Sequence, residues 1–286
     1  EFAMMKLAVW QEIIRPVIAQ DSERWALFGF TPKGRNHAYD YWEMTKDREG
    51  WFRSFLPASQ SGIIPAIELA KAKEEMPEAS FMQEFECYFL EYYAGVFKER
   101  FIQQCIGGEL EEYIDGKEYT LGVDLAKHLD YSVIVVVRND TKQIVYFDRF
   151  NETSWSLQRS RIIEIAKSYG GALIVPDSTG VGDPIVEDLE RSGCNVWYEK
   201  EGRSGFVFTS TSKERLIENL IICIEHKKCQ FPKIDVLIQE LRDFEVSYTA
   251  QGKVKYSAPD GKHDDCVIAL ALALFPDTSA ELVWLA

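Results

Sequence analysis

The strongest pattern of hydrophobic positions in the chain lies between Tyr119 and Val137. Val133 to Val137 is an unbroken run of β-branched apolar residues, and Leu121 and Val123 flank Gly122 just before it. An unbroken apolar run is typical of a strand that is buried on both faces. The pattern therefore predicts two strands joined by a tight turn, at the centre of a sheet that helices cover.

The residue that breaks this pattern is Asp124. A carboxylate beside a buried strand is unfavourable unless something pairs with it. A divalent metal ion would be such a partner, but an aspartate at this place could also simply cap the turn. The stretch alone leaves both interpretations open.

The second half of the chain shows a regular succession of further elements. Its order is three antiparallel strands followed by alternating helices and strands, which is the order of a ribonuclease H-like fold of the α/β class, a mixed sheet flanked by helices. The expected strands are 119–124, 131–138, 143–150, 172–176 and 195–198, with a hairpin over 245–256. The expected helices are 154–169, 184–191, 211–226 with a Thr211/Glu214 capping box, 234–244 and 264–274.

The first half is less regular. We expect an amphipathic helix around 9–17, which Pro16 ends or kinks, then a strand over 25–30 and a sharp turn at Thr31–Gly34 before a helix over 36–44. A connector follows, with helices at 66–75 and around Phe81 and a strand at 87–90. These shifts predict three segments, 1–50, 51–100 and 101–286.

Composition narrows the possible functions. A net charge of −14 and a pI near 4.9 argue against a surface coated for non-specific nucleic-acid binding, so any such role needs a local site. No apolar run is long enough to span a membrane, and the six cysteines are scattered, as reduced thiols of an intracellular protein would be.

Three of the apolar elements end or begin at an aspartate: Asp124, Asp177 and the pair Asp264-Asp265. If the first two strands are neighbours, their aspartates emerge side by side, and the last helix can bring the third carboxylate to them. Two Mg²⁺ or Mn²⁺ ions, about 3.5–4 Å apart, would relieve the repulsion and clamp both oxygens of a phosphoryl transfer. Oxygen ligands suit these ions better than zinc. One such aspartate is more often a cap, but three in this order are a more specific signal.

Several stretches resemble the large terminase subunit of tailed bacteriophages. GVDLAKHLDYSV, PDSTGVGDPIVEDL and KHDDCVIALALAL are similar to its three nuclease motifs, and EFAMMKLAVWQEIIRP followed by ALFGFTPKGRNHAYDYW is similar to the second half of its P-loop-type ATPase domain. The resemblance covers essentially the whole chain. It implies a partial ATPase domain, a linker subdomain and a complete nuclease domain.

The resemblance also implies roles for individual residues. Asp124, Asp177 and Asp264 would be the catalytic metal ligands for Mg²⁺ or Mn²⁺, with Asp265 a rival at the third position. Asp130 matches an additional acidic position, and Asp183 is expected to be an N-cap or turn residue. His263 could assist proton transfer or orient the scissile phosphate, although a histidine before a helix more often caps it.

In the ATPase part, the same resemblance makes Glu1 the Walker B glutamate and places Thr31 in the coupling motif. No GxxxxGK[ST] motif occurs in the sequence, so we expect no ATP hydrolysis by this chain itself and a need for ATP only in the intact motor. The expected place of action is the host cytoplasm, at the portal vertex of the procapsid.

The expected partners are double-stranded DNA, the portal protein and the small terminase subunit, with no membrane. The basic residues expected to hold the DNA backbone are Arg203, Lys200, Lys253, Lys255 and Lys262. Two alternatives stay open: a resolvase- or transposase-like nuclease of the same fold, against which TPKGRNHAYDYW argues, and a non-catalytic module whose acidic patch docks on the portal or small subunit.

Overall fold

The computed structural model describes residues 1–20, 23–90, 95–126, 130–179, 182–198, 204–248 and 254–276. The chain divides into two compact units, Glu1–Tyr93 and Ala94–Ala286. No helix among the described residues combines the length and the apolar character needed to cross a membrane.

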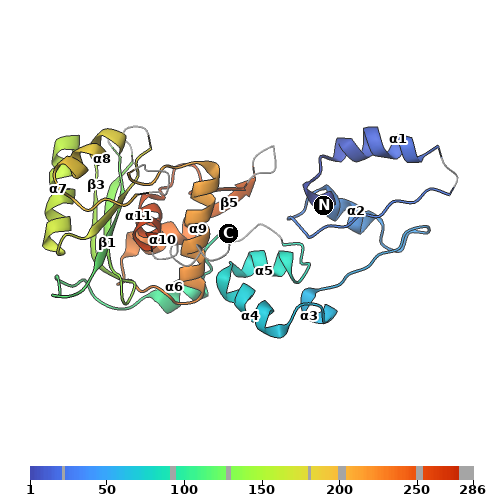
Figure 1. The fold of residues 1–286 in the computed structure, drawn as a ribbon, viewed down its shortest axis with the longest axis horizontal. Coiled ribbons are helices and arrows are strands. Elements are labelled where there is room, and N and C mark those ends of the chain that lie inside the picture. The colour runs from blue at the N-terminus through green and yellow to red at the C-terminus, as the bar shows by residue number, and fades with distance from the viewer. Residues whose placement is uncertain are drawn as a thin grey trace. The chain divides into compact units, whose positions relative to one another are not determined.

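The second unit is built on a mixed sheet of four strands (Figure 1). The strands are β1 (Tyr119–Asp124), β2 (Ser132–Arg138), β3 (Gln143–Phe150) and β4 (Leu173–Pro176), in the order β3-β2-β1-β4. β1 pairs antiparallel with β2 and parallel with β4, and β2 pairs antiparallel with β3. A bridge between Ile174 and Val196 adds one more segment beyond β4. The predicted mixed sheet is confirmed.

Helices cover both faces of this sheet, as Figure 1 shows. On one face lie α7 (Trp155–Ser168) and α8 (Gly182–Arg191); on the other lie α9 (Ser210–Glu225), α10 (Asp235–Asp243) and α11 (Asp265–Leu274), with α6 (Glu99–Cys105). Successive β2 side chains alternate between the two layers, Val133 and Val135 toward α9 and α11, Ile134 toward α7 and α8. All three are fully buried, which is why the run in the sequence is uninterrupted.

Gly122 lets α11 lie directly against β1. A Cβ at this position would be 2.0 Å from the carbonyl oxygen of Ala269 and 2.4 Å from the backbone nitrogen of Ala273. No other residue fits such a close approach. The start of α11 is one turn before Ala269, so the close packing brings that start toward the end of β1.

The hairpin β5 (Glu245–Tyr248) and β6 (Val254–Ser257) completes the second unit, with Glu245 opposite Ser257. The predicted hairpin is present, and the residues that connect its strands, 249–253, lie outside the described part of the chain. The predicted tight turn after β1 partly does so too, at residues 127–129.

The first unit consists of short helices around a small aromatic cluster. The helices are η1 (Phe2–Met4), η2 (Val9–Ile14), α1 (Arg15–Ile18), α2 (His37–Met44), α3 (Ala58–Ser61), α4 (Ala66–Glu75) and α5 (Glu78–Glu84). The cluster contains Phe2, Trp10 and Ala38, and Phe28 packs against it. Pro16 does not end the helical run, because a wider π-helical turn precedes it and α1 continues to Ile18.

Four expectations about local structure are wrong. The segment 25–30 forms no strand, because its described backbone makes one cross-chain bond, from Phe2 N to Gly29 O at 3.0 Å, and a strand needs a continuous partner. Residues 87–90 form no strand either, and 195–198 makes only isolated bridges. The box that caps α9 pairs Thr209 with Ser212, two residues before the predicted Thr211 and Glu214.

Candidate metal centre

Asp124 and Asp177 lie side by side at the carboxyl ends of two neighbouring parallel strands. Asp124 is the last residue of β1 and Asp177 directly follows β4. The two strands are in register at Val123 and Pro176, and the backbone N–H of Asp177 donates to the carbonyl of Val123 at 2.9 Å. The juxtaposition expected from the sequence is therefore present, at the sheet edge where α/β proteins place their ligands.

The start of α11 adds two more carboxylates. Asp264 is the N-cap residue and Asp265 the first helical residue, as the apolar periodicity predicts. The Asp264 side chain makes no capping hydrogen bond, which leaves it available for other contacts. Asp265 is 7% exposed, and its Oδ2 accepts a hydrogen bond from the backbone N–H of Tyr131 at 3.4 Å.

The electrostatics of the cluster show how close these groups are. Burial raises the pKa of Asp124 well above its usual range, and the charges of Asp265, Asp177 and Asp264 raise it further, in that order. Burial likewise raises the pKa of Asp177, although hydrogen bonds from Thr179 oppose the rise. The pKa of Asp265 rises to about 6, first through burial and then through the charge of Glu240. A cluster of this kind strongly favours a positive partner.

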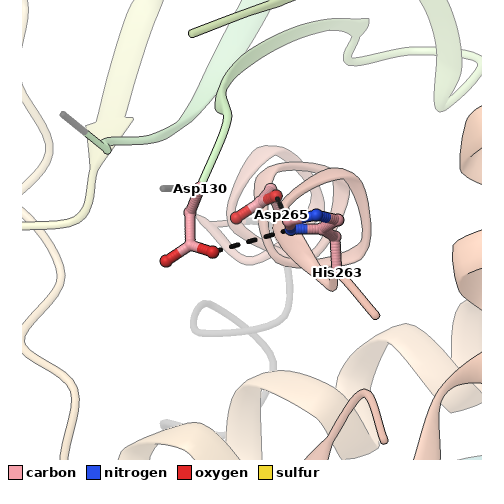
Figure 2. A group of neighbouring side chains, drawn as sticks. All are labelled: Asp130, His263 and Asp265. Atoms are coloured by element: carbon pink, nitrogen blue, oxygen red, sulfur yellow. Dashed lines mark ion pairs between the residues drawn. The ribbon is translucent and has the colours of Figure 1, made fainter. Parts of the chain in front are cut away.

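A second group of possible ligand atoms lies next to the first. Asp130, His263 and Asp265 each offer one atom to a set in which all atoms lie within 4.8 Å of one another (Figure 2). His263 Nδ1 is 3.6 Å from Asp130 Oδ1 and 3.5 Å from Asp265 Oδ2. The three auxiliary residues of the sequence analysis thus come together, and they could hold a cation.

Lys213 is a residue of this centre that the sequence analysis missed. Its Nζ lies 3.4 Å from Asp264 Oδ2, and its charge acts on both Asp124 and Asp177. Nothing in the local sequence marks this lysine, because only the packing of α9 beside α11 brings it to the carboxylates.

A buried ion pair behind the centre was also missed. Glu240 of α10 accepts from the backbone N–H of Cys266 at 2.7 Å, which satisfies a donor at the start of α11. Arg149 of β3 pairs with Glu240 at 3.2 Å and lies over the ring of Tyr131, with its Cζ 3.4 Å from the ring centroid. The contacts join β3, α10 and the segment before β2 to the helix start that carries Asp264 and Asp265.

The structure places the other predicted residues differently. Lys262 pairs with Asp243 at 2.8 Å, and Lys255 lies exposed on β6. Lys200, Arg203 and Lys253 lie outside the described residues. Asp183 is not an N-cap, because α8 already begins at Gly182.

In the first unit, the two residues assigned to the ATPase part touch each other. The backbone N–H of Thr31 donates to Glu1 Oε1 at 3.3 Å. The turn that follows Thr31 is held to α5, because Gly34 N donates to Gln83 Oε1 at 3.0 Å and Lys33 pairs with Glu84.

Known proteins with similar sequences and structures identify the family. The model of the terminase RNaseH-like domain matches residues 121–276. The large terminase subunit of Thermus virus P23-45 is 32% identical over 96% of this chain, which spans 59% of that relative's length.

Two solved structures extend this likeness. The large terminase nuclease of the thermophilic phage G20c with bound magnesium is 32% identical, with a TM-score of 0.57 over 64% of this chain and 98% of that one. The large terminase of another thermophilic bacteriophage, 10% identical, covers 92% of this chain and 66% of its own with a TM-score of 0.59, which shows a shared fold that reaches into the first unit. The resemblance found in the sequence is confirmed, and the chain belongs to the large terminase family with an RNase H-like nuclease domain.

Proposed function

We propose that this chain is the nuclease-bearing part of a terminase large subunit, which cuts concatemeric double-stranded DNA by hydrolysing phosphodiester bonds with two divalent ions, Mg²⁺ or Mn²⁺. The observation that carries the proposal is the convergence of Asp124, Asp177 and the start of α11 at one edge of the sheet. The family and the magnesium bound to the G20c nuclease support it.

The residues present fit divalent ions with a preference for oxygen. The donors are carboxylates, and the pKa values of Asp124, Asp177 and Asp265 are raised by burial, so ionising the cluster is unfavourable without a counter-charge. Such oxygen-rich sets suit Mg²⁺ and Mn²⁺. When bound, the ions would activate the attacking water and stabilise both oxygens of the in-line displacement.

The protein side chains then divide the work. Asp124, Asp177 and Asp264 would hold the ions, and Asp265 and Asp130 would supply further oxygens beside them. His263, between Asp130 and Asp265, would orient the phosphate or take up a proton at Nδ1. Thr179 keeps Asp177 in place, since its backbone N–H donates to Asp177 Oδ1 at 2.7 Å.

Cleavage of plasmid DNA by an Asp124→Asn variant tests the proposal. We expect single-turnover cleavage in Mg²⁺ or Mn²⁺ to fall by at least about 10²-fold, because the neutral amide holds the ions poorly and charge stabilisation in the transition state is lost. Asp115→Asn is a matched control, because Asp115 is exposed and precedes the opposite end of β1. Cleavage by Asp124→Asn at the rate of the control would contradict the proposal.

A second pair of variants assigns the carboxylates of α11. With Asp264 as ligand and Asp265 as auxiliary, Asp264→Asn eliminates cleavage and Asp265→Asn leaves a reduced rate. The structure gives both residues a place near Asp124, since their charges both raise its pKa. The opposite result would make Asp265 the principal ligand.

The wider role follows the family. In the intact subunit we infer coupling to ATP-driven DNA translocation, with Glu1 and Thr31 in the motor part, and docking to the portal and small subunit at the procapsid. Basic residues, among them the exposed Lys255, would hold the DNA backbone. Lys255→Met should weaken binding about equally for unrelated DNA sequences, and a loss confined to one sequence would indicate base readout instead.

A further inference from the structure

Lys213 lies in the first turn of α9, and this end of the helix is attached to the segment that carries Asp177. The backbone N–H of Phe208 donates to Thr179 Oγ1 at 2.9 Å, and the N–H of Thr179 donates to Asp177 Oδ1 at 2.7 Å. Thr209 caps the helix by accepting from Ser212 N at 3.0 Å. The position of Lys213 is therefore fixed relative to the carboxylates by a short chain of hydrogen bonds.

The ammonium of Lys213 reaches three carboxylates from three different elements. It lies 3.4 Å from Asp264 Oδ2, and its charge lowers the pKa of Asp124 and of Asp177 against the larger effect of burial. The side chains of Lys213 and Asp264 are 31% and 27% exposed, so a substrate that enters the centre can reach both.

The contact with Asp264 is looser than a strong ion pair. Its 3.4 Å exceeds the N···O distance of about 2.7–2.9 Å that is typical of charged hydrogen bonds. The pair of Lys262 and Asp243, outside the carboxylate cluster, is closer at 2.8 Å. An ammonium has three donors, and this contact uses one of them. Lys213 thus has donors left for a second anion.

We propose that Lys213 contacts the substrate, with its ammonium bound to a non-bridging oxygen of the phosphodiester that is cut. The inference rests on the proposed nuclease function and adds a residue to its machinery. A phosphate that approaches a cluster of carboxylates is repelled, and a lysine is a compact charge suited to phosphate oxygens. Lys213 is the described lysine whose charge acts on Asp124 and Asp177, so it supplies attraction at the point where the DNA must bind.

The first measurement is the salt dependence of DNA binding. Fluorescence anisotropy with a labelled duplex in EDTA compares wild type, Lys213→Met and Lys213→Arg. Loss of one phosphate contact should reduce the slope of log K against log salt by about 0.9, and arginine should restore it. Lys228→Met is the matched control, since Lys228 is exposed just beyond the other end of α9. An unchanged slope in Lys213→Met would overturn the proposal.

Cleavage and metal binding separate this role from a positioning role. In Mg²⁺, single-turnover cleavage by Lys213→Met should fall by about 10²-fold, the usual loss when one charge-stabilising donor is removed. Mn²⁺ binding to the protein without DNA, measured by calorimetry, should stay equal or become tighter, because a competing cation is gone. Weaker Mn²⁺ binding together with an unchanged salt slope would show that Lys213 only positions Asp264.

Two controls keep these outcomes distinct. If circular dichroism shows that Lys213→Met is misfolded, Lys213→Gln replaces it, and the comparison with Lys213→Arg still isolates the charge. Failure of the nuclease proposal itself appears elsewhere, as undiminished cleavage by Asp124→Asn. If Asp124→Asn is inactive while Lys213→Met keeps the wild-type salt slope, the nuclease function stands and the assignment of Lys213 falls.

Discussion

The two units of the chain use their hydrophobic residues very differently. In the second unit, large side chains such as Phe206, Phe231 and Phe244 are completely buried. In the first unit, Leu27 is 85% exposed and Phe52 is 90% exposed. Apolar residues occur in both sequences, so the difference lies in what each segment has to pack against. Among the described residues, it is the second unit in which a sheet with helices on both faces supplies the partners.

This contrast explains why the metal centre belongs to the second unit. Carboxylates can be held close together only where the surrounding elements are fixed by extensive packing. β1, β4 and α11 are fixed in this way, because Gly122 lets the helix lie on the strand and Glu240 holds the helix start. We can test the contrast by making the same change in both units, beginning with the largest expected effect.

Phenylalanine to alanine should show the largest difference between the units. Phe231→Ala removes a fully buried ring and should lower the free energy of unfolding of the second unit by about 3–5 kcal/mol. Phe52→Ala should change the stability of the first unit by less than about 0.5 kcal/mol. Amide hydrogen exchange, read peptide by peptide, reports each unit separately. Comparable losses in the two units would refute the contrast.

Glycine to alanine should show the next largest difference. Gly122→Ala places a Cβ 2.0 Å from the backbone of α11, so the helix must move and the second unit should lose about 3 kcal/mol, the upper end of overpacking effects. Gly29→Ala is the control, because nothing lies within 4 Å of its new Cβ and its φ is not in the left-handed region.

The displaced helix carries Asp264 and Asp265, so Gly122→Ala should also reduce DNA cleavage, even under conditions where the protein is still folded. Cleavage and hydrogen exchange measured on the same sample check both effects. A Gly122→Ala variant with wild-type stability and activity would show that α11 does not need the close approach to β1.

The acidic cluster should make the stability of the second unit depend on pH when metal is absent. The folded-state pKa of Asp265 is about 6, above its ordinary value of 3.8, so folding favours the protonated carboxyl. Its contribution is therefore present below pH 4 and is lost as the pH rises through 6. At about 1.4 kcal/mol per pKa unit, the loss is about 3 kcal/mol.

Chemical denaturation in EDTA between pH 4 and pH 7 measures this effect. The wild-type second unit should lose stability over this range, Asp265→Asn should lose less, and Mg²⁺ should restore stability at pH 7. The first unit serves as an internal reference, since its carboxylates, such as Glu68, lie on the surface. A stability that rises between pH 4 and pH 7 in wild type but not in Asp265→Asn would reverse the sign of the argument.

The sequence was informative wherever a local pattern coincided with a packed environment. The β1–β4 strands, the start of α11 and the convergence of Asp124 with Asp177 follow from apolar runs that end at aspartates. The segment 25–30 has the same apolar character, but no described segment pairs with it as a strand. Apolar periodicity tells what a segment could bury and not whether a partner is there.

The parts of the centre that the sequence analysis missed come from residues far apart in the chain. Lys213 meets Asp264 across 51 positions, and Arg149 meets Glu240 across 91. Each of these side chains has an ordinary local context, and its role arises only from the packing of one element against another. No local pattern could have identified them.

The smallest expected effect concerns helix caps, which should be alike in the two units. Asn36 caps α2 in the first unit by accepting from Ala38 N at 2.9 Å, and Thr209 caps α9 in the second by accepting from Ser212 N at 3.0 Å. A cap satisfies a donor within its own first turn, so its contribution does not depend on the core around it. Asn36→Ala and Thr209→Ala should each lower stability by about 1 kcal/mol.

Thr211→Ala is the matched control for the second unit, because Thr211 lies inside α9, where it does not act as the cap. It should change the stability by less than about 0.5 kcal/mol, as measured by hydrogen exchange of α9. If Thr211→Ala cost as much as Thr209→Ala, the helix would begin two residues later, as its sequence suggested. If Asn36→Ala cost far less than Thr209→Ala, the difference between the units would extend to their local interactions, and packing alone would not account for it.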